Sequence, residues 1–264
     1  MKRLHLFEFH ELDRFPTVLR DQVTDFLSSF VLFLNPYRVI SERLARAVER
    51  SGATCIVDLC SGGAQPILTV KKELDRKGKS IPIIISDKFP NKKAFTAVEE
   101  KFSKDVSAIH GSVDATDVPA KLSGFRTIFT AFHHFKEEDA QQILADAVRK
   151  NQGIGIFEYT ERSIAWAFYA LNIPWVVLLI NLFSKPFTWQ RFAFTYIIPI
   201  LPFLVFFDGA VSCLRTYSPR QLEELIQSID LATTSTDYEW EIGQLRTIGI
   251  LKVTYLIGWP KHPT

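Results

Sequence analysis

The stretch that most constrains the fold of this chain runs from Thr54 to Ala64 and reads TCIVDLCSGGA. It begins as a short apolar run typical of a buried β-strand, reaches an acid at Asp58 and opens into a glycine-rich turn. Residues able to begin a helix follow from Gln65. Glycine lets the backbone approach a ligand closely, and a helix N-terminus presents unpaired N–H groups. The stretch therefore predicts either a nucleotide-binding turn or an ordinary strand-to-helix connection.

Strand-like and helix-like segments alternate along the first part of the chain. Short apolar runs other than the first lie at 81–86, 106–111, 125–131 and 153–158. Helical spacing of apolar residues covers 18–33, 39–50, 65–76, 91–103 and 136–150. Short apolar strands separated by helices are typical of a parallel sheet covered on both faces.

The last part of the chain follows a different pattern. Ser218 and Pro219 open a helix that we expect to reach Ile229, and two strand-like runs, 238–242 and 248–259, then follow each other without a helix between them. Such consecutive strands pair as an antiparallel hairpin. The predicted fold class is thus α/β: a Rossmann-like doubly wound sheet of mostly parallel strands that ends in an antiparallel hairpin, with an inserted apolar helical hairpin.

Composition narrows the classes of partner. With 264 residues, 47% of them hydrophobic, the chain can bury a large core. A formal net charge of +2, with Lys and Arg spread along the sequence, argues against nucleic acid as a partner. The three cysteines, Cys55, Cys60 and Cys213, have neither metal-type spacing nor an even disulfide framework, so we expect reduced thiols and no metal. The first residues have no long apolar core and are not expected to be a secretion signal.

The predicted insertion is unusually apolar. Neither 165–183 nor 192–207 contains a charged residue, and the connection between them carries Lys185 and Arg191. The first stretch is long enough for a transmembrane helix, and the second is marginal. Three alternatives stay open: a full crossing, an interfacial or re-entrant hairpin anchored by Trp and Tyr, and a buried insertion or dimer face. We expect membrane contact through residues 163–207, on the cytoplasmic side of a membrane, and keep a homodimer as an alternative.

Acids follow three of the predicted strands, at the edge where parallel sheets bind ligands: Asp58, Asp87 and Asp114. In this order of motifs the chain resembles the class I S-adenosylmethionine-dependent methyltransferases, clearly over about residues 40 to 160 and in outline over 218–259. The resemblance implies S-adenosyl-L-methionine as the cofactor. The chain departs from the family's glycine pattern at Cys60 and Ala64, where it has other small residues. The positions that the resemblance assigns to the cofactor are Asp58, Cys60, Ser61, Gly62, Gly63, Asp87, Lys88, Val113, Asp114, Ala115 and Phe132.

Two of these acids also have simpler explanations. Asp87 is close enough to Asn91 to cap the helix predicted there, and a buried Asp58 could serve only to orient the turn.

Catalytic and substrate residues are expected near the ends of the last parallel strands and after the insertion. His133 and His134 follow the strand at 125–131, in the region that in the family faces the reacting methyl group. Either His, or Glu158, is a candidate general base, although a structural role and a mechanism without a base remain open. Asp208, Arg215 and Tyr217 are candidates for a substrate site, and Asp208 and Arg215 could instead pair with other charges.

The sequence therefore predicts a methyltransferase domain at 54–162 and 216–264, an N-terminal helical segment at 1–53 and an apolar hairpin at 163–215. The expected function is methyl transfer to a lipophilic or membrane-delivered small molecule. The alternatives are a non-catalytic membrane-associated binding module on the same fold and an NAD-dependent oxidoreductase, against which the terminal strand pair argues.

Overall fold

The computed structural model describes residues 2–12, 14–102, 104–163, 166, 170–233, 237–249 and 251–262. The chain forms two compact units. Segments Pro36–Tyr159 and Tyr217–Thr264 make up the sheet unit, and Met1–Asn35 and Thr160–Thr216 make up the helical unit. The boundary between the units at Pro36 therefore lies within the segment 1–53, and the helix that follows this proline packs with the sheet.

The described part of the sheet unit contains a seven-stranded sheet in the order β3-β2-β1-β4-β5-β7-β6. The first five strands in sequence pair in parallel, whereas β7 is antiparallel to both β5 and β6. This arrangement confirms the predicted parallel sheet and its terminal hairpin. The strands are β1 (Ile56–Leu59), β2 (Ile83–Ile85), β3 (Val106–Ala108), β4 (Phe125–Phe129), β5 (Ile154–Glu158), β6 (Tyr238–Arg246) and β7 (Lys252–Pro260).

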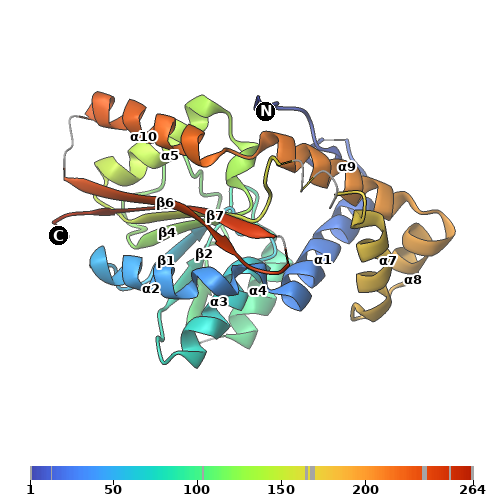
Figure 1. Cartoon of the computed structure of the whole chain (residues 1–264). Helices are drawn as coiled ribbons and strands as arrows, with labels where there is room; N and C mark the ends of the chain where they lie inside the picture. Colours follow the sequence, from blue (N-terminus) through green and yellow to red (C-terminus); the bar gives the residue numbers. More distant parts are fainter. Residues whose placement is uncertain are drawn as a thin grey trace. The chain divides into compact units, whose positions relative to one another are not determined.

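Helices cover both faces of this sheet (Figure 1). On one face lie α5 (Glu137–Arg149) and α10 (Pro219–Thr233), whose Leu144 and Leu225 share a core with Val57 and Leu59 of β1. Because neighbouring residues of a strand point to opposite faces, Ile56 and Asp58 point to the other face. The helices there are α2 (Ser41–Arg50), α3 (Gln65–Arg76) and α4 (Lys92–Lys101). Short 3-10 turns precede α2 at Pro36–Ile40 (η2) and follow β4 at Phe132–His134 (η3).

The helical unit joins the start of the chain to the predicted insertion. Val23 and Phe26 of α1 (Thr17–Leu34) share a core with Val177 of α7 (Ile173–Phe183) and Leu204 of α9 (Ile200–Arg215). Phe9 and Phe15 pack against the same core. The remaining elements are the 3-10 turn η1 (Phe9–Glu11), α8 (Trp189–Phe192) and a π-helical turn, η4 (Ala193–Ile197).

The helices of the insertion bear on the full crossing, one of the three alternatives left open by the sequence. Within the described ranges no single helix combines the length and the apolar character of a bilayer crossing; one pair, Trp189–Ile197 with Ile200–Arg215, does so only jointly and is bent by 79°. The break falls at Pro199, which has no N–H to continue a helix. Helix α7 has 11 residues. Residues 164, 165 and 167–169, which belong to the first predicted apolar helix, lie outside the described residues.

Candidate functional site

The turn after β1 has an unusual backbone. Cys60, Gly62 and Ala64 all adopt positive φ angles, of 55°, 52° and 59°. This left-handed region favours glycine, because a β-carbon there approaches the following carbonyl oxygen. A β-carbon added at Gly62 would meet no atom within 4 Å, so the space beside this glycine is open. The turn therefore keeps the backbone shape of a glycine-rich ligand loop even where the chain has Cys and Ala.

Asp58, the last acid before this turn, is hydrogen-bonded to it. Its Oδ2 accepts a hydrogen bond from Ser61 Oγ at 2.6 Å, and its Oδ1 accepts one from Thr127 Oγ1 at 2.6 Å. Burial raises the pKa of Asp58 to about 7, because the two hydroxyl bonds compensate only part of the desolvation and the charge of Asp87 adds to it. The side chain is 3% exposed, so Asp58 orients the turn and its neighbours.

Asp87 lies at the next strand end and reaches across to the turn. Its Oδ2 accepts a hydrogen bond from the Gly62 N–H at 2.9 Å, and its Oδ1 accepts one from the Phe89 N–H at 2.8 Å. It does not cap α4, because Asn91 does so by accepting from the Ala94 N–H at 3.1 Å. Each oxygen of an ionised carboxylate can accept a further hydrogen bond, so Asp87 can still bind hydroxyl groups of a ligand.

Asp114 lies beyond the third strand end and is paired with Lys88. The distance from Lys88 Nζ to Asp114 Oδ2 is 2.6 Å. The hydrogen bond from Lys88, helped by the Thr116 N–H and hydroxyl, lowers the pKa of Asp114 to about 2 despite partial burial. Backbone contacts tie this turn to the previous strand, since the Val113 N–H donates to the Asp87 carbonyl at 2.9 Å.

The three strand-end acids act on a common neighbour, the half-buried Cys60. Burial raises the pKa of its thiol strongly, and the charges of Asp87, Asp58 and Asp114 raise it further. Cys60 is therefore a neutral thiol and a poor nucleophile. The structure thus brings together Asp58, Asp87, Asp114 and the glycine-rich turn at the carboxyl ends of β1, β2 and β3.

Other predicted cofactor residues contribute backbone more than side chain. Gly63 completes the turn, and Ser112 next to Val113 donates its hydroxyl to the Lys88 carbonyl at 2.7 Å. The side chains of Val113 and Ala115 are buried in the core between the sheet and α5 and α10. Phe132 is also in this core, where its ring packs against Tyr217 with centroids 5.4 Å apart.

His133 and Glu158 form a buried pair at the ends of β4 and β5. His133 Nδ1 is 3.0 Å from Glu158 Oε2, and the His133 N–H donates to Glu158 Oε1 at 3.1 Å. Although burial raises the pKa of Glu158, the positive charge and hydrogen bonds of His133 outweigh it and leave that pKa lowered. Glu158 therefore holds the His133 ring through Nδ1 and its backbone through the N–H.

The rings of His133 and His134 lie on the same side. A continuing strand would place them on opposite faces, but β4 ends at Phe129 and residues Phe132–His134 form a 3-10 turn. The two ring centroids are 4.2 Å apart.

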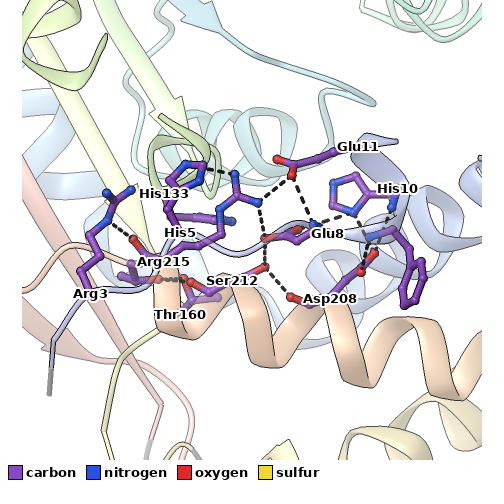
Figure 2. Close-up of polar contacts among 12 residues, drawn as sticks. Arg3, His5, Glu8, His10, Glu11, His133, Thr160, Asp208, Ser212 and Arg215 are labelled. Carbon is purple, nitrogen blue, oxygen red and sulfur yellow. Dashed lines mark hydrogen bonds and ion pairs between the residues drawn. The ribbon is translucent and has the colours of Figure 1, made fainter. Parts of the chain in front are cut away.

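The predicted substrate residues divide between the two units. Tyr217 belongs to the sheet unit and donates its hydroxyl to the Phe135 carbonyl at 2.9 Å. Asp208 and Arg215 lie on α9 in the helical unit and face the N-terminal segment (Figure 2). A substrate site shared by all three residues stays a prediction.

The contacts of α9 with the N-terminal segment form a polar network. Asp208 Oδ1 accepts from the Phe9 N–H at 2.7 Å, and Asp208 Oδ2 is 2.9 Å from His10 Nδ1. Arg215 Nη1 lies 3.3 Å from Glu8 Oε1 and 2.7 Å from Glu11 Oε2. Asp208 and Arg215 are therefore paired with groups of the N-terminal segment, as the second interpretation of these residues predicted.

Two residues of the sheet unit's site region were missed from the sequence. Thr127 lies opposite Asp58 in the β1–β4 register, and only the pairing reveals that its hydroxyl meets the acid. Tyr37 is fully buried, bonds the Thr130 hydroxyl and packs edge-on to Phe129. The available signal for Thr127 was a polar side chain within the predicted strand 125–131, and the sequence offered none for Tyr37.

Comparisons with known proteins bear on the fold. No protein-family model matches the sequence, and no curated protein is detectably similar to it. Among solved structures, the plantazolicin methyltransferase BpumL in complex with SAH matches 95% of this chain and 92% of its own, with a TM-score of 0.54 and 11% identity. Human N-acetylserotonin methyltransferase (ASMT) in complex with SAM matches 87% of this chain and 55% of its own, with a TM-score of 0.47 and 12% identity.

The first of these matches carries the assignment, because it spans nearly the whole of both chains. It agrees with the strand order and with the terminal antiparallel pair of the sheet. The chain has the fold of the class I S-adenosylmethionine-dependent methyltransferases.

Proposed function

We propose that this protein is an S-adenosylmethionine-dependent methyltransferase that acts on a lipophilic or membrane-delivered small molecule. The observation that carries the proposal is the position of Asp87, whose carboxylate lies at the end of β2 and bonds the Gly62 N–H of the glycine-rich turn. A carboxylate at this strand end is suited to bind the two hydroxyl groups of a ribose. The open space beside Gly62 allows a ligand to approach the backbone there.

The residues present fit the nucleoside end of S-adenosylmethionine. Asp87 would hold the ribose, and the turn formed by Ser112, Val113 and Asp114 would meet the adenine edge. Asp58 and Thr127 would keep the glycine-rich turn in place without touching the ligand. Lys88 would hold Asp114 ionised, so that it accepts hydrogen bonds.

The bound cofactor supplies a methyl group on a sulfonium, which leaves as a neutral thioether when an acceptor takes the methyl. The protein's task is therefore to align the acceptor, exclude water and, where needed, remove its proton. His133, whose Nδ1 lies 3.0 Å from Glu158, is our first candidate to take that proton, and Glu158 is the second. His134, beside it, would help to orient an acceptor. The lipophilic character of the acceptor is inferred from the apolar insertion.

Isothermal titration of S-adenosylmethionine into the purified protein tests the proposal. We expect the wild type to bind and Asp87→Ala to lose at least about a hundredfold in affinity, because two charge-assisted hydrogen bonds are removed. Asp87→Asn is the matched control and should show an intermediate loss, since an amide keeps one acceptor oxygen. Absence of binding by the wild type would contradict the proposal.

The second part of the proposal is that the acceptor is lipophilic. Transfer of a labelled methyl group from S-adenosylmethionine to a total lipid extract tests this part. Incorporation supports a lipophilic acceptor. Tight cofactor binding with no transfer would favour the alternative of a non-catalytic binding module on this fold.

A further inference from the structure

Helix α7 is apolar except for the buried Asn181, but only one side of it is buried. Val177 and Ile180 face the core of the helical unit. On the other side, Trp175, Leu179 and Leu182 are 69%, 61% and 66% exposed and, being four and three residues apart, share one face. No charged residue occurs in this helix. A helix whose surface is apolar on all sides is typical of a buried or lipid-contacting position. Because one face of α7 is exposed, the first of these positions does not account for it.

The exposed apolar surface continues beyond the end of α7. Phe187 and Trp189 are 64% and 73% exposed, and their rings contact each other edge-on at 5.4 Å. The Tyr196 hydroxyl donates to the Leu178 carbonyl at 2.6 Å and so ties η4 to α7. We call this set the α7–α8 surface; its members are Trp175, Leu179, Leu182, Phe183, Phe187 and Trp189.

The charges of this segment all have one sign. Residues 163–207 contain no Asp or Glu, and their only formal charges are on Lys185 and Arg191. Arg191 is buried and pairs with Asp25 of α1 at 3.2 Å. Lys185 is exposed and lies in the sequence between two members of the surface, Phe183 and Phe187.

We propose that the α7–α8 surface docks onto the headgroup region of an anionic lipid bilayer, with α7 in the plane of the membrane. Tryptophan and phenylalanine are suited to the boundary between headgroups and acyl chains, and an exposed lysine complements anionic headgroups. A two-fold contact between copies of this surface would instead bury Lys185 beside its symmetry mate, with no acid from residues 163–207 to pair with it. The charge pattern therefore favours lipid over a second copy.

Helix α9 keeps its polar contacts and its core side chains in this arrangement, although its Phe203 is exposed. Its Asp208 and Arg215 are buried and bonded to the N-terminal segment, and its Leu201 and Leu204 complete the core with α1 and α7. The surface that meets lipid is therefore one face of the helical unit and needs no opening of its core.

Co-sedimentation of the full chain with vesicles tests the proposal independently of any methyl transfer. We expect binding to vesicles of phosphatidylcholine mixed with phosphatidylglycerol and weaker binding to phosphatidylcholine alone. A Trp175→Gln, Trp189→Gln variant should bind at least about tenfold more weakly, because two interfacial anchors are lost. Lys185→Gln should lose about fivefold, only on the vesicles that contain phosphatidylglycerol.

A further variant separates loss of lipid binding from loss of folding. Leu179→Asp adds an acid at a 61% exposed position and should abolish binding to the mixed vesicles while its thermal unfolding stays close to that of the wild type. Phe89→Gln, at an 82% exposed aromatic residue of the sheet unit, is the matched control and should bind as the wild type does. Unchanged binding by the double tryptophan variant and by Leu179→Asp would overturn the proposal. So would a lipid-free dimer that these variants dissociate, with no vesicle binding by the wild type.

Discussion

At the scale of single residues, the protonation of Asp58 links the site to stability. Its pKa is raised from an ordinary value near 3.8 to about 7 in the folded protein, chiefly by burial. The folded state therefore binds more protons than the unfolded state between these values. The stabilisation that comes from protonated Asp58 is complete below about pH 4 and is lost as the pH rises toward 7.

An Asp58→Asn variant tests this linkage. The amide has the same shape and does not titrate; its oxygen accepts from one of the Ser61 and Thr127 hydroxyls, and its NH2 group donates to the other. We expect its free energy of unfolding in urea to fall less than that of the wild type between about pH 5 and about pH 8, and to equal or exceed the wild-type value at the higher pH. An identical pH dependence in both proteins would show that Asp58 is not the group responsible.

Ala64 tests the backbone of the turn. Its φ is 59° and its side chain is fully buried. Ala64→Gly should change the free energy of unfolding by less than about 1 kcal/mol, because relief of left-handed strain offsets the loss of a buried methyl group. Ala64→Val should cost more than about 2 kcal/mol, since a β-branched side chain is poorly tolerated there. Thermal unfolding compares them; equal effects of the two variants would contradict a left-handed turn.

Residue positions were predictable where the backbone alone determines them. The sequence placed Asp58, Asp87 and Asp114 after strands, and strand ends of a parallel sheet share an edge. It did not reveal the contact of Thr127 with Asp58, because that contact depends on the register of two strands far apart in sequence. Nor did it reveal that Asn91, and not Asp87, caps α4, since both residues precede that helix.

At the scale of elements, the N-terminal segment and α9 are joined by buried charges. Glu8 and Arg215 are 1% and 2% exposed, so replacing either one leaves a buried charge in the helical unit. We expect Arg215→Met to lower the free energy of unfolding by about 3 kcal/mol or more. Glu8→Met combined with Arg215→Met should recover much of this loss, because an apolar pair replaces the ion pair.

A double-mutant cycle by chemical unfolding measures this coupling. Glu11 is 32% exposed and also contacts Arg215, so Glu11→Gln is the milder control. Additive losses in the double variant would contradict direct pairing of Glu8 with Arg215.

The apolar pattern of the insertion predicted its helices but not how they bend or what they pack against. Absence of charge over 165–183 and 192–207 predicted helices, and helices form over Ile173–Phe183 and Ile200–Arg215. The same pattern did not indicate the π-helical turn that precedes Pro199 or the size of the bend there, which is 79°. The partners of the insertion were equally hidden, since α1 lies far away in the sequence.

At the scale of the whole molecule, the chain leaves the sheet unit and returns to it. The helical unit takes the first residues and the stretch between β5 and α10, while the order of the strands follows the predicted alternation. The parallel pairing of the first five strands was predictable because short apolar strands separated by helices are typical of a parallel sheet. The grouping of Met1–Asn35 with Thr160–Thr216 was not, because it depends on complementary side chains and not on periodicity.

The central claim is that the strand ends of β1, β2 and β3 hold the nucleoside of S-adenosylmethionine. Hydrogen–deuterium exchange of the protein with and without S-adenosylmethionine tests it most directly, because it locates the ligand on the chain. We predict slower exchange in the presence of the cofactor at residues 60–64, 87–89 and 111–115. Unchanged exchange in all three segments at saturating cofactor, or protection confined to other parts of the chain, would contradict the claim.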